Sequence, residues 1–263
     1  MIQLNEHIIS NDRFPDGTLL LKLPFSPKPS NEIRWHYEND AELFKLICLV
    51  KTMREMYKGV RIDLFMPYLP NARQDRIKNP EDVFTLKYFC EIINSLEFDT
   101  VFVTDVHSNV SLALLDRVKE IKPWEYINKA IYIIPVDREL VLFCPDEGAM
   151  KRYSSALNSP FAFGIKRRNW ETGVIEGLEI VGKDMIAGRN VLIIDDICSK
   201  GGTFYHSAKA LKEAGAANIY LYVTHCENTI HEGELLKEDS LIKEIFTTNS
   251  ILTKTHEKIT IVN

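Results

Sequence analysis

The sequence lacks the segments that would direct a chain to a membrane or hold it there. Its start, MIQLNEHIISNDRF, has neither the basic region nor the continuous apolar stretch of a signal peptide, and no apolar run approaches the roughly 20 residues that span a bilayer. Low-complexity tracts, which would indicate disorder, are also missing. We therefore expect a folded, cytoplasmic protein that does not act on membranes.

An excess of positive charge is lacking as well. The chain has 32 basic and 37 acidic residues, a formal net charge of -5, which repels a polyanion and argues against general binding of nucleic acids. The cysteines are odd in number and scattered without a CxxC pair, so neither a zinc site nor a disulfide framework is expected. We interpret all five as buried thiols: Cys48, Cys90, Cys144, Cys198 and Cys226.

What the sequence does contain is a repeated alternation of short apolar runs and amphipathic segments. With 263 residues it is long enough for two modest domains, since a domain typically has about 100 to 150 residues. Alternating strands and helices predict an α/β fold with mainly parallel sheets and crossover helices. The strand and helix pairs are expected at 61–69 and 81–96, at 100–107 and 111–121, and at 190–197 and 202–216.

Details of this pattern predict where elements pack and end. In the helix expected at 81–96, the apolar residues recur at spacings of three and four, as one buried face requires; they are Val83, Phe84, Leu86, Phe89, Cys90 and Ile93. Gly215 is expected at the end of the helix at 202–216, where a positive φ is common. Apolar runs at 130–136 and 139–148 begin a second copy of the pattern, which predicts domains 1–127 and 128–263, and 244–263 supplies closing strands.

The strand at 190–194 is followed at once by Asp195-Asp196-Ile197-Cys198-Ser199-Lys200-Gly201-Gly202-Thr203 and a helix. Ligands of open parallel sheets bind beyond the carboxyl ends of the strands. Gly201 and Gly202 let backbone N–H groups approach a phosphate, while the hydroxyls of Ser199 and Thr203 can donate to it. The carboxylates suit sugar hydroxyls or a metal, so the loop predicts a sugar phosphate site; a plain strand–helix turn would leave the two charges unexplained.

This loop resembles the phosphoribosyl diphosphate loop of type I phosphoribosyltransferases and ribose-phosphate diphosphokinases. The resemblance implies two tandem domains of the type I phosphoribosyltransferase fold, each with a mainly parallel sheet flanked by helices. It also implies that ribose 5-phosphate is bound by Asp195 and Asp196 and by Ser199, Lys200, Gly201, Gly202 and Thr203.

Further segments favour the diphosphokinases over the transferases. Pro67-Tyr68-Leu69-Pro70-Asn71-Ala72-Arg73-Gln74-Asp75-Arg76 is similar to their ATP-binding PYxxYARQDR stretch, which implies that Arg73 and Gln74 bind ATP. The segment 104–107, TDVH, resembles the family's (M/T)DLH and implies that His107 lies by the metal and the ATP phosphates. The segment 145–149 resembles SPDxGG and implies that Asp146 helps to hold magnesium.

Two further similarities complete the resemblance. Ile165-Lys166-Arg167-Arg168 is similar to the basic loop that closes over the transferring group, which implies catalytic roles for Lys166 and Arg168 beside His107. The segment 12–18, DRFPDGT, resembles RFSDGE, whose aromatic and acidic residues contact adenine from a neighbouring subunit. Phe14 and Asp16 are therefore expected at the ATP site of a homo-oligomer, a dimer or a hexamer.

The implied reaction transfers a diphosphoryl group from ATP to ribose 5-phosphate with Mg²⁺ as cofactor, giving 5-phosphoribosyl 1-diphosphate and AMP. The chain is short for this family, and Ser199-Lys200 stands where Asp-Thr is common. Two alternatives stay open at this point: a phosphoribosyltransferase that consumes the diphosphate, and a non-catalytic relative that binds nucleotides and regulates a partner. Allosteric control is not indicated by the sequence.

Overall fold

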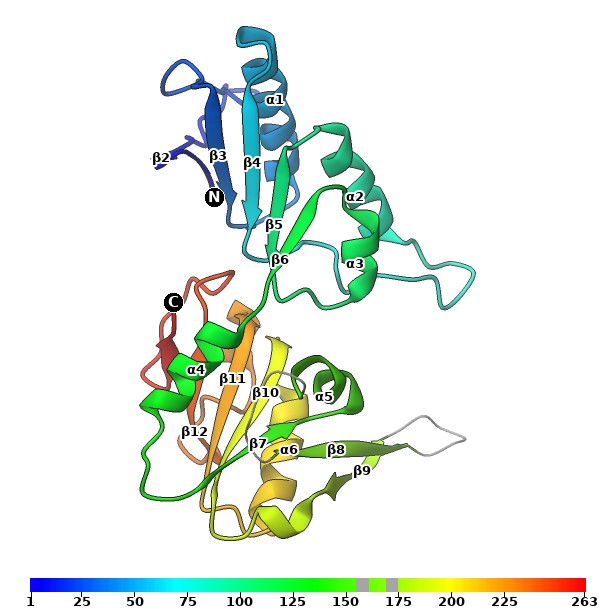
Figure 1. Ribbon diagram of the computed structural model, residues 1–263, viewed down its shortest axis with the longest axis vertical. Coiled ribbons are helices and arrows are strands. Elements are labelled where there is room, and N and C mark those ends of the chain that lie inside the picture. The colour runs from blue at the N-terminus through cyan, green and yellow to red at the C-terminus, as the bar shows by residue number, and fades with distance from the viewer. Residues whose placement is uncertain (155–160, 169–174) are drawn as a thin grey trace. The chain divides into compact units, whose positions relative to one another are not determined.

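The computed structural model describes residues 1–154, 161–168 and 175–263 and divides the chain into two compact units (Figure 1). The first unit is Met1–Lys122 and the second is Pro123–Asn263. The division lies shortly before residue 127, the boundary that the sequence pattern indicated. No helix among the described residues is long and apolar enough to cross a membrane.

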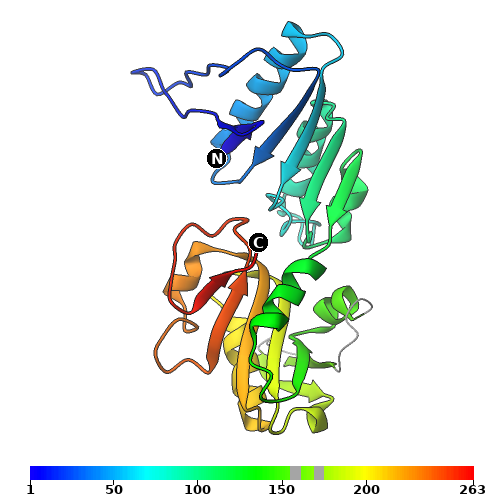
Figure 2. The ribbon, with the colours of Figure 1, turned by 60° about the vertical axis from the view of Figure 1, so that its left-hand side comes forward.

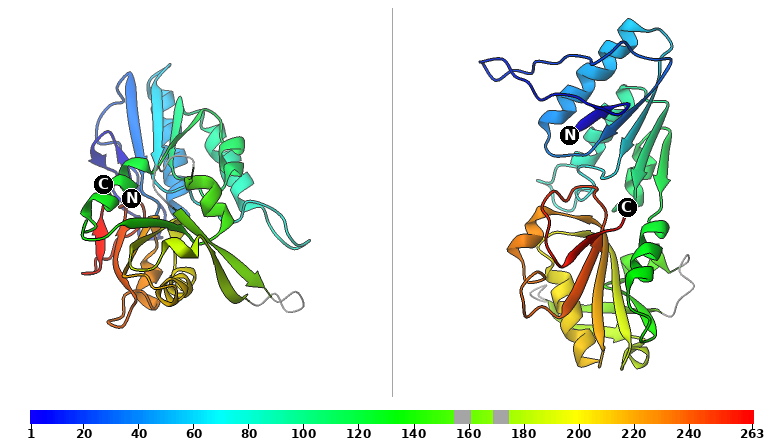
Figure 3. Two further views of the ribbon diagram at one scale, coloured as in Figure 1. Left: turned by 60° about the horizontal axis from the view of Figure 1, so that its bottom comes forward. Right: turned by 90° about the vertical axis from the view of Figure 1, so that its left-hand side faces the viewer.

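The first unit is built on one six-stranded sheet in the order β2-β1-β3-β4-β5-β6. Strands β3 to β6 are parallel, whereas β1 pairs antiparallel with both β2 and β3. The strands are β1 (Ile2–Leu4), β2 (His7–Ile8), β3 (Ser30–Trp35), β4 (Arg61–Met66), β5 (Thr100–Thr104) and β6 (Val118–Ile121). The helices are α1 (Ala41–Met56), α2 (Thr85–Ser95) and α3 (Asn109–Leu114). The segment between β2 and β3 extends away from the sheet (Figure 3).

Helix α2 follows the apolar spacing of the sequence, but it begins later than expected. Leu86, Phe89, Cys90 and Ile93 are buried in the single core of this unit. Val83 is 54% exposed and precedes the helix, because the chain from residue 77 to 84 forms a loop whose Asp82 side chain accepts backbone N–H groups at Lys78 and Asn79. The prediction that Val83 belongs to the buried face was therefore wrong.

The second unit has a seven-stranded sheet in the order β13-β12-β11-β10-β7-β8-β9, parallel except for the β8–β9 hairpin. Its strands are β7 (Leu140–Cys144), β8 (Phe161–Arg168), β9 (Ile175–Val181), β10 (Asn190–Cys198), β11 (Asn218–Cys226), β12 (Ile242–Thr247) and β13 (Ile259–Ile261). The helices are α4 (Trp124–Ile133), α5 (Glu147–Tyr153) and α6 (Gly202–Glu213), with short 3-10 turns η1 (Lys183–Met185) and η2 (Asn228–Glu232). Both units thus confirm the predicted α/β class with mainly parallel sheets and flanking helices.

Both faces of this second sheet are covered (Figure 2). Helix α6 packs on one face through Phe204, Ala208 and Leu211, which join Val191 and Ile193 of β10. Helices α4 and α5 pack on the other face, against the alternate residues of β10, Leu192 and Ile194. A strand buried on both faces reads as a continuous apolar run, which is why 190–194 was recognisable in the sequence.

The run at 130–136 is not the strand that the sequence indicated. It contains the end of α4 and an exposed turn, in which Val136 is 98% exposed. Ile127, Ala130 and Ile134 are buried at spacings of three and four, a helical period that the apolar residues between them obscure. The closing strands expected in 244–263 are present as the end of β12 and as β13.

The strands of the second unit are aligned by a buried amide network at their amino ends. Asn190 is fully buried and pairs in register with Asn218 of β11. The Nδ2 of Asn218 donates to Oδ1 of Asn190 over 2.8 Å, and the Nδ2 of Asn190 donates to the carbonyl of Pro135 over 3.2 Å. Gly215, between α6 and β11, has a φ of 90°, as the sequence predicted for the helix end.

Candidate functional site

The carboxyl ends of β7 and β10, which are adjacent and parallel, bring two acidic segments to one edge of the second sheet. Asp146 follows β7 and caps helix α5, since its Oδ1 accepts the N–H of Ala149 over 3.1 Å. Asp195 and Asp196 lie near the carboxyl end of β10, followed in the strand only by Ile197 and Cys198. Burial raises the pKa of Asp195 well above its usual range, and the carboxylates of Asp196 and, more weakly, Asp146 add to this. Three carboxyl groups therefore lie close together at this edge of the sheet.

Asp196 is held by a cation that the sequence analysis did not identify. Its Oδ1 lies 3.0 Å from Nη1 of Arg152, on α5, and only 3% of the residue is exposed. The backbone N–H of Asp196 donates to Oδ1 of Asp195 over 2.9 Å, so the two neighbours are also linked directly. The sequence around Arg152 did not indicate this contact, because a basic residue at the end of a short helix is usually solvated.

The loop after β10 leads into helix α6 through a glycine in the left-handed conformation. Gly201 has a φ of 80° and caps α6, which begins at Gly202. A Cβ on Gly201 would lie 2.3 Å from Cδ1 of Leu235, so only glycine fits this position. Gly202 and Thr203 are exposed at the amino end of the helix, where backbone N–H groups lack intrahelical partners. An anion binds favourably at such an end.

The side chains of Ser199 and Lys200 contact the segment that follows β11. Oγ of Ser199 lies 3.0 Å from Oγ1 of Thr229, and Nζ of Lys200 lies 2.9 Å from Oε2 of Glu232. The hydrogen bond to Lys200 lowers the pKa of Glu232. Thr229 and Glu232 had no motif to mark them, because their role arises from a contact between distant parts of the chain.

In the first unit, the segment that resembles the ATP-binding stretch lies beside the end of β5. Asp75 is 7% exposed and accepts two hydrogen bonds from the guanidinium of Arg76. Nε donates to Oδ1 over 2.7 Å, and Nη2 donates to Oδ2 over 2.8 Å. Hydrogen bonds from Arg76 and then from Ser108 lower the pKa of Asp75 to about 2, and the charge of His107 adds to the effect. The segments that carry Arg73 and His107 are therefore neighbours.

The two residues that precede Asp75 differ in how they are held. Arg73 is exposed, and Gln74 is tied to the start of α2 because its Oε1 accepts the hydroxyl of Thr85 over 2.9 Å. His107 is also exposed, in a turn that begins with the left-handed residue Asp105, at a φ of 41°. This strained turn ends the strand and projects His107 outward.

The remaining two segments of the resemblance, 12–18 and 165–168, lie in a turn and in a strand. Phe14, 50% exposed, and Asp16 lie in a tight turn closed by the N–H of Phe14 on the carbonyl of Thr18, at 2.9 Å. Hydrogen bonds from Thr18 lower the pKa of Asp16. Lys166 and Arg168 lie in β8, opposite β9. Their side chains and residues 169–174 lie outside the described part of the chain.

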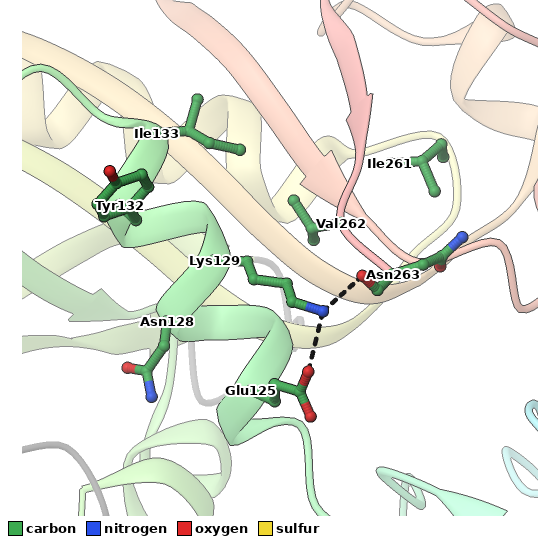
Figure 4. A pocket seen from close by; sticks show the side chains of 8 residues that line it. All are labelled: Glu125, Asn128, Lys129, Tyr132, Ile133, Ile261, Val262 and Asn263. Atoms are coloured by element: carbon green, nitrogen blue, oxygen red, sulfur yellow. Dashed lines mark hydrogen bonds and ion pairs between the residues drawn. The ribbon is translucent and has the colours of Figure 1, made fainter.

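A separate pocket of about 520 Å³ lies on the second unit between α4 and β13 (Figure 4). Nζ of Lys129 crosses it, 2.9 Å from Oε1 of Glu125 and 2.6 Å from the carbonyl of Asn263. Its remaining lining residues are Asn128, Tyr132, Ile133, Ile261 and Val262. None of them belongs to the loops described above.

Comparison with known proteins tests the resemblance that the motifs suggested. Residues 172–262 match the model of a phosphoribosyl synthetase-associated domain. The ribose-phosphate pyrophosphokinase of Pyrococcus abyssi is 29% identical over 257 residues, which cover 95% of this chain and 86% of the relative. That of Saccharolobus solfataricus is 26% identical over 96% of this chain and 88% of its own.

The fold is shared with a solved structure. The phosphoribosylpyrophosphate synthetase of Mycobacterium smegmatis superposes with a TM-score of 0.76 at 19% identity, over 97% of this chain and 85% of that one. These similarities extend over both units rather than over the sugar phosphate loop alone. Along almost its whole length, the chain is similar in sequence to ribose-phosphate pyrophosphokinases.

Proposed function

We propose that this protein is a ribose-phosphate diphosphokinase, which transfers the β,γ-diphosphoryl group of ATP to the C1 hydroxyl of ribose 5-phosphate. The products are 5-phosphoribosyl 1-diphosphate and AMP. The observation that supports this most is the similarity to ribose-phosphate pyrophosphokinases over 95% of the chain. A phosphoribosyltransferase has no need of the first unit, whose Arg73–Arg76 segment resembles an ATP-binding stretch.

Ribose 5-phosphate is assigned to the second unit. The exposed start of α6 at Gly202 and Thr203 offers N–H groups and a hydroxyl to the 5-phosphate. Asp195 and Asp196 accept hydrogen bonds from the ribose hydroxyls, and Arg152 keeps the carboxylate of Asp196 in place. A sugar held in this way loses little freedom on reaching the transition state, since the partners are already fixed.

ATP is assigned to the first unit, with contacts from Arg73, Gln74 and His107 and, through the turn at 14–18, from Phe14 and Asp16. A guanidinium binds phosphate oxygens in pairs, so exposed Arg73 suits a polyphosphate. The cations Lys166 and Arg168 act on the transferred group, where they offset charge as the bond to the leaving AMP loosens. We further propose a homo-oligomer, in which the turn at 14–18 serves a neighbouring subunit.

The residues present fit Mg²⁺ that arrives with the nucleotide. No group of three or more potential ligands occurs among the described side chains, and Mg²⁺ at phosphate sites commonly needs only one or two carboxylates. Asp146 is near enough to Asp195 for its charge to raise the pKa of Asp195, so these two carboxyl groups could hold the ion together. By the resemblance, His107 is assigned to the nucleotide phosphates that carry the ion. When bound, Mg²⁺ withdraws negative charge from the phosphates and so favours attack on phosphorus.

The decisive experiment is to incubate the full chain with ATP and ribose 5-phosphate, with and without Mg²⁺, and to identify the nucleotide product. AMP that appears only when all three are present supports the proposal, whereas ADP indicates transfer of a single phosphoryl group. Asp195→Asn should abolish AMP formation, while Asp184→Asn, an exposed carboxylate on η1, should leave it unchanged. Absence of any nucleotide product would favour the non-catalytic alternative.

A further inference from the structure

The segment Glu227–Leu235, here called the cover segment, packs closely against the sugar phosphate loop. The N–H of Glu227 donates to the carbonyl of Cys198 over 2.8 Å. A Cβ on Gly233 would lie 1.9 Å from the carbonyl oxygen of Lys200, and one on Gly201 would lie 2.3 Å from Leu235. Such close approach over several residues means that the cover segment and the loop must move together.

A series of hydrogen bonds through three polar side chains joins the cover segment to the sugar phosphate loop. Oγ1 of Thr229 donates to Oε2 of Glu227 over 3.1 Å, and it lies 3.0 Å from Oγ of Ser199. A carboxylate has no hydrogen to donate and a threonine hydroxyl has one. Since Thr229 gives its hydrogen to Glu227, it must accept the hydrogen of Ser199. The hydroxyl hydrogen of Ser199 therefore points to the cover segment.

This direction conflicts with a direct role for Ser199 in holding a phosphate. Phosphate oxygens are acceptors, so Ser199 could bind one only by giving up Thr229. Lys200 is likewise paired with Glu232, but both side chains are more than half exposed, and solvent screens the attraction between charges in such a pair. The Ser199–Thr229–Glu227 chain is thus the stronger link.

We propose that Thr229, oriented by Glu227, is a positioning residue for the sugar phosphate loop and acts through Ser199. Ser199 fixes the loop backbone, and the 5-phosphate is bound by the N–H groups and hydroxyl at the start of α6. This inference rests on the proposed function for the identity of the ligand.

The test measures the affinity of the full chain for ribose 5-phosphate by titration calorimetry, together with the KM of each substrate. Thr229→Val keeps the shape of the side chain but removes its hydroxyl. We expect this variant to bind ribose 5-phosphate about five-fold more weakly, as loss of one hydrogen bond does, and to have an unchanged KM for ATP. Thr229→Ser should restore wild-type affinity. The matched control is Thr260→Val, whose hydroxyl donates to Oε1 of Glu244 over 2.6 Å, between β13 and β12 and outside the cover segment.

A double-mutant cycle tests whether Thr229 acts through Ser199 or independently of it. If Ser199 acts through Thr229, the double variant Ser199→Ala/Thr229→Val binds as weakly as either single variant. If the two effects multiply, or if Thr229→Val binds like the wild type, the inference is overturned. Should Thr229→Val fail to fold, Thr229→Ala, which removes the same hydroxyl with a smaller side chain, takes its place in the cycle. A wild-type chain that does not bind ribose 5-phosphate would instead refute the proposed function.

Discussion

Replacement of Arg152 with methionine should destabilise the second unit by about 3 kcal/mol. The substitution keeps an unbranched apolar stem but leaves the carboxylate of Asp196, 3% exposed, without the guanidinium 3.0 Å away. Removal of one partner from a buried ion pair costs about 3 to 5 kcal/mol. Because the side chain of Arg152 is itself 22% exposed, water can reach part of the site, and we expect the lower end of that range.

Calorimetric unfolding of the full chain provides the measurement. In a unit of this size, about 3 kcal/mol corresponds to a fall of about 10 °C in the Tm of the transition that contains α5 and β10. Lys151→Met is the matched control on the same helix, since Lys151 is 74% exposed and its contact with Glu147 is long, at 3.9 Å; it should change the Tm by less than about 2 °C.

A second variant tests the reason for the loss. If the cost comes from an unpaired buried charge, then Arg152→Met/Asp196→Leu, which removes both charges, should be more stable than Arg152→Met alone. Equal Tm values for Arg152→Met and Lys151→Met would show that the pair is solvated in solution. A double variant less stable than both single variants would show that packing, not charge, holds α5 on β10.

Three further predictions concern other parts of the chain. Lys166→Ala should lower kcat far more than it raises the KM for ribose 5-phosphate, because the cation acts mainly in the transition state; steady-state kinetics with a raised KM and normal kcat would contradict this. Asp75→Asn should lower the free energy of unfolding in urea by about 1 to 2 kcal/mol at pH 7, since it breaks the contacts with Arg76 and Ser108. The pKa of Asp75, about 2, lies below its ordinary value of 3.8, so this stabilisation is complete above about pH 4 and the difference should shrink as pH falls towards 2. The prediction that all five cysteines are buried was wrong for Cys48, which is only partly buried. In thiol labelling at pH 8, Cys48 should react in the folded chain, while the four buried cysteines should react only after denaturation.

The parts of the fold that the sequence predicted are those whose signal is local. The segment 190–216 could be interpreted because a strand buried on both faces, a diglycine turn and an amphipathic helix each have their own pattern. The run at 130–136 was misassigned because a short apolar stretch has the same composition at the end of a helix as in a strand. The start of α2 was misplaced because the Asp82 loop competes with helix for the same backbone groups.

The candidate site shows the same limit. Its loop residues were marked by type and order, but Arg152 and Thr229 were not, since their importance depends on contacts with residues far away in the sequence. The direction of the Ser199 hydroxyl could not be inferred either, because it is fixed by Glu227, which lies two residues before Thr229, the partner of Ser199.

The amide network at Asn190 bears on how this site can change during evolution. Side chains in a strand alternate between faces, so a shift of one residue between β10 and β11 would turn every apolar side chain to the wrong side. Asn190 and Asn218 prevent that shift from the end of the strands opposite the loop. Substitutions after Cys198, such as the unusual Ser199-Lys200, can therefore accumulate without misaligning the scaffold, which leaves ligand preference open to selection while the framework stays the same.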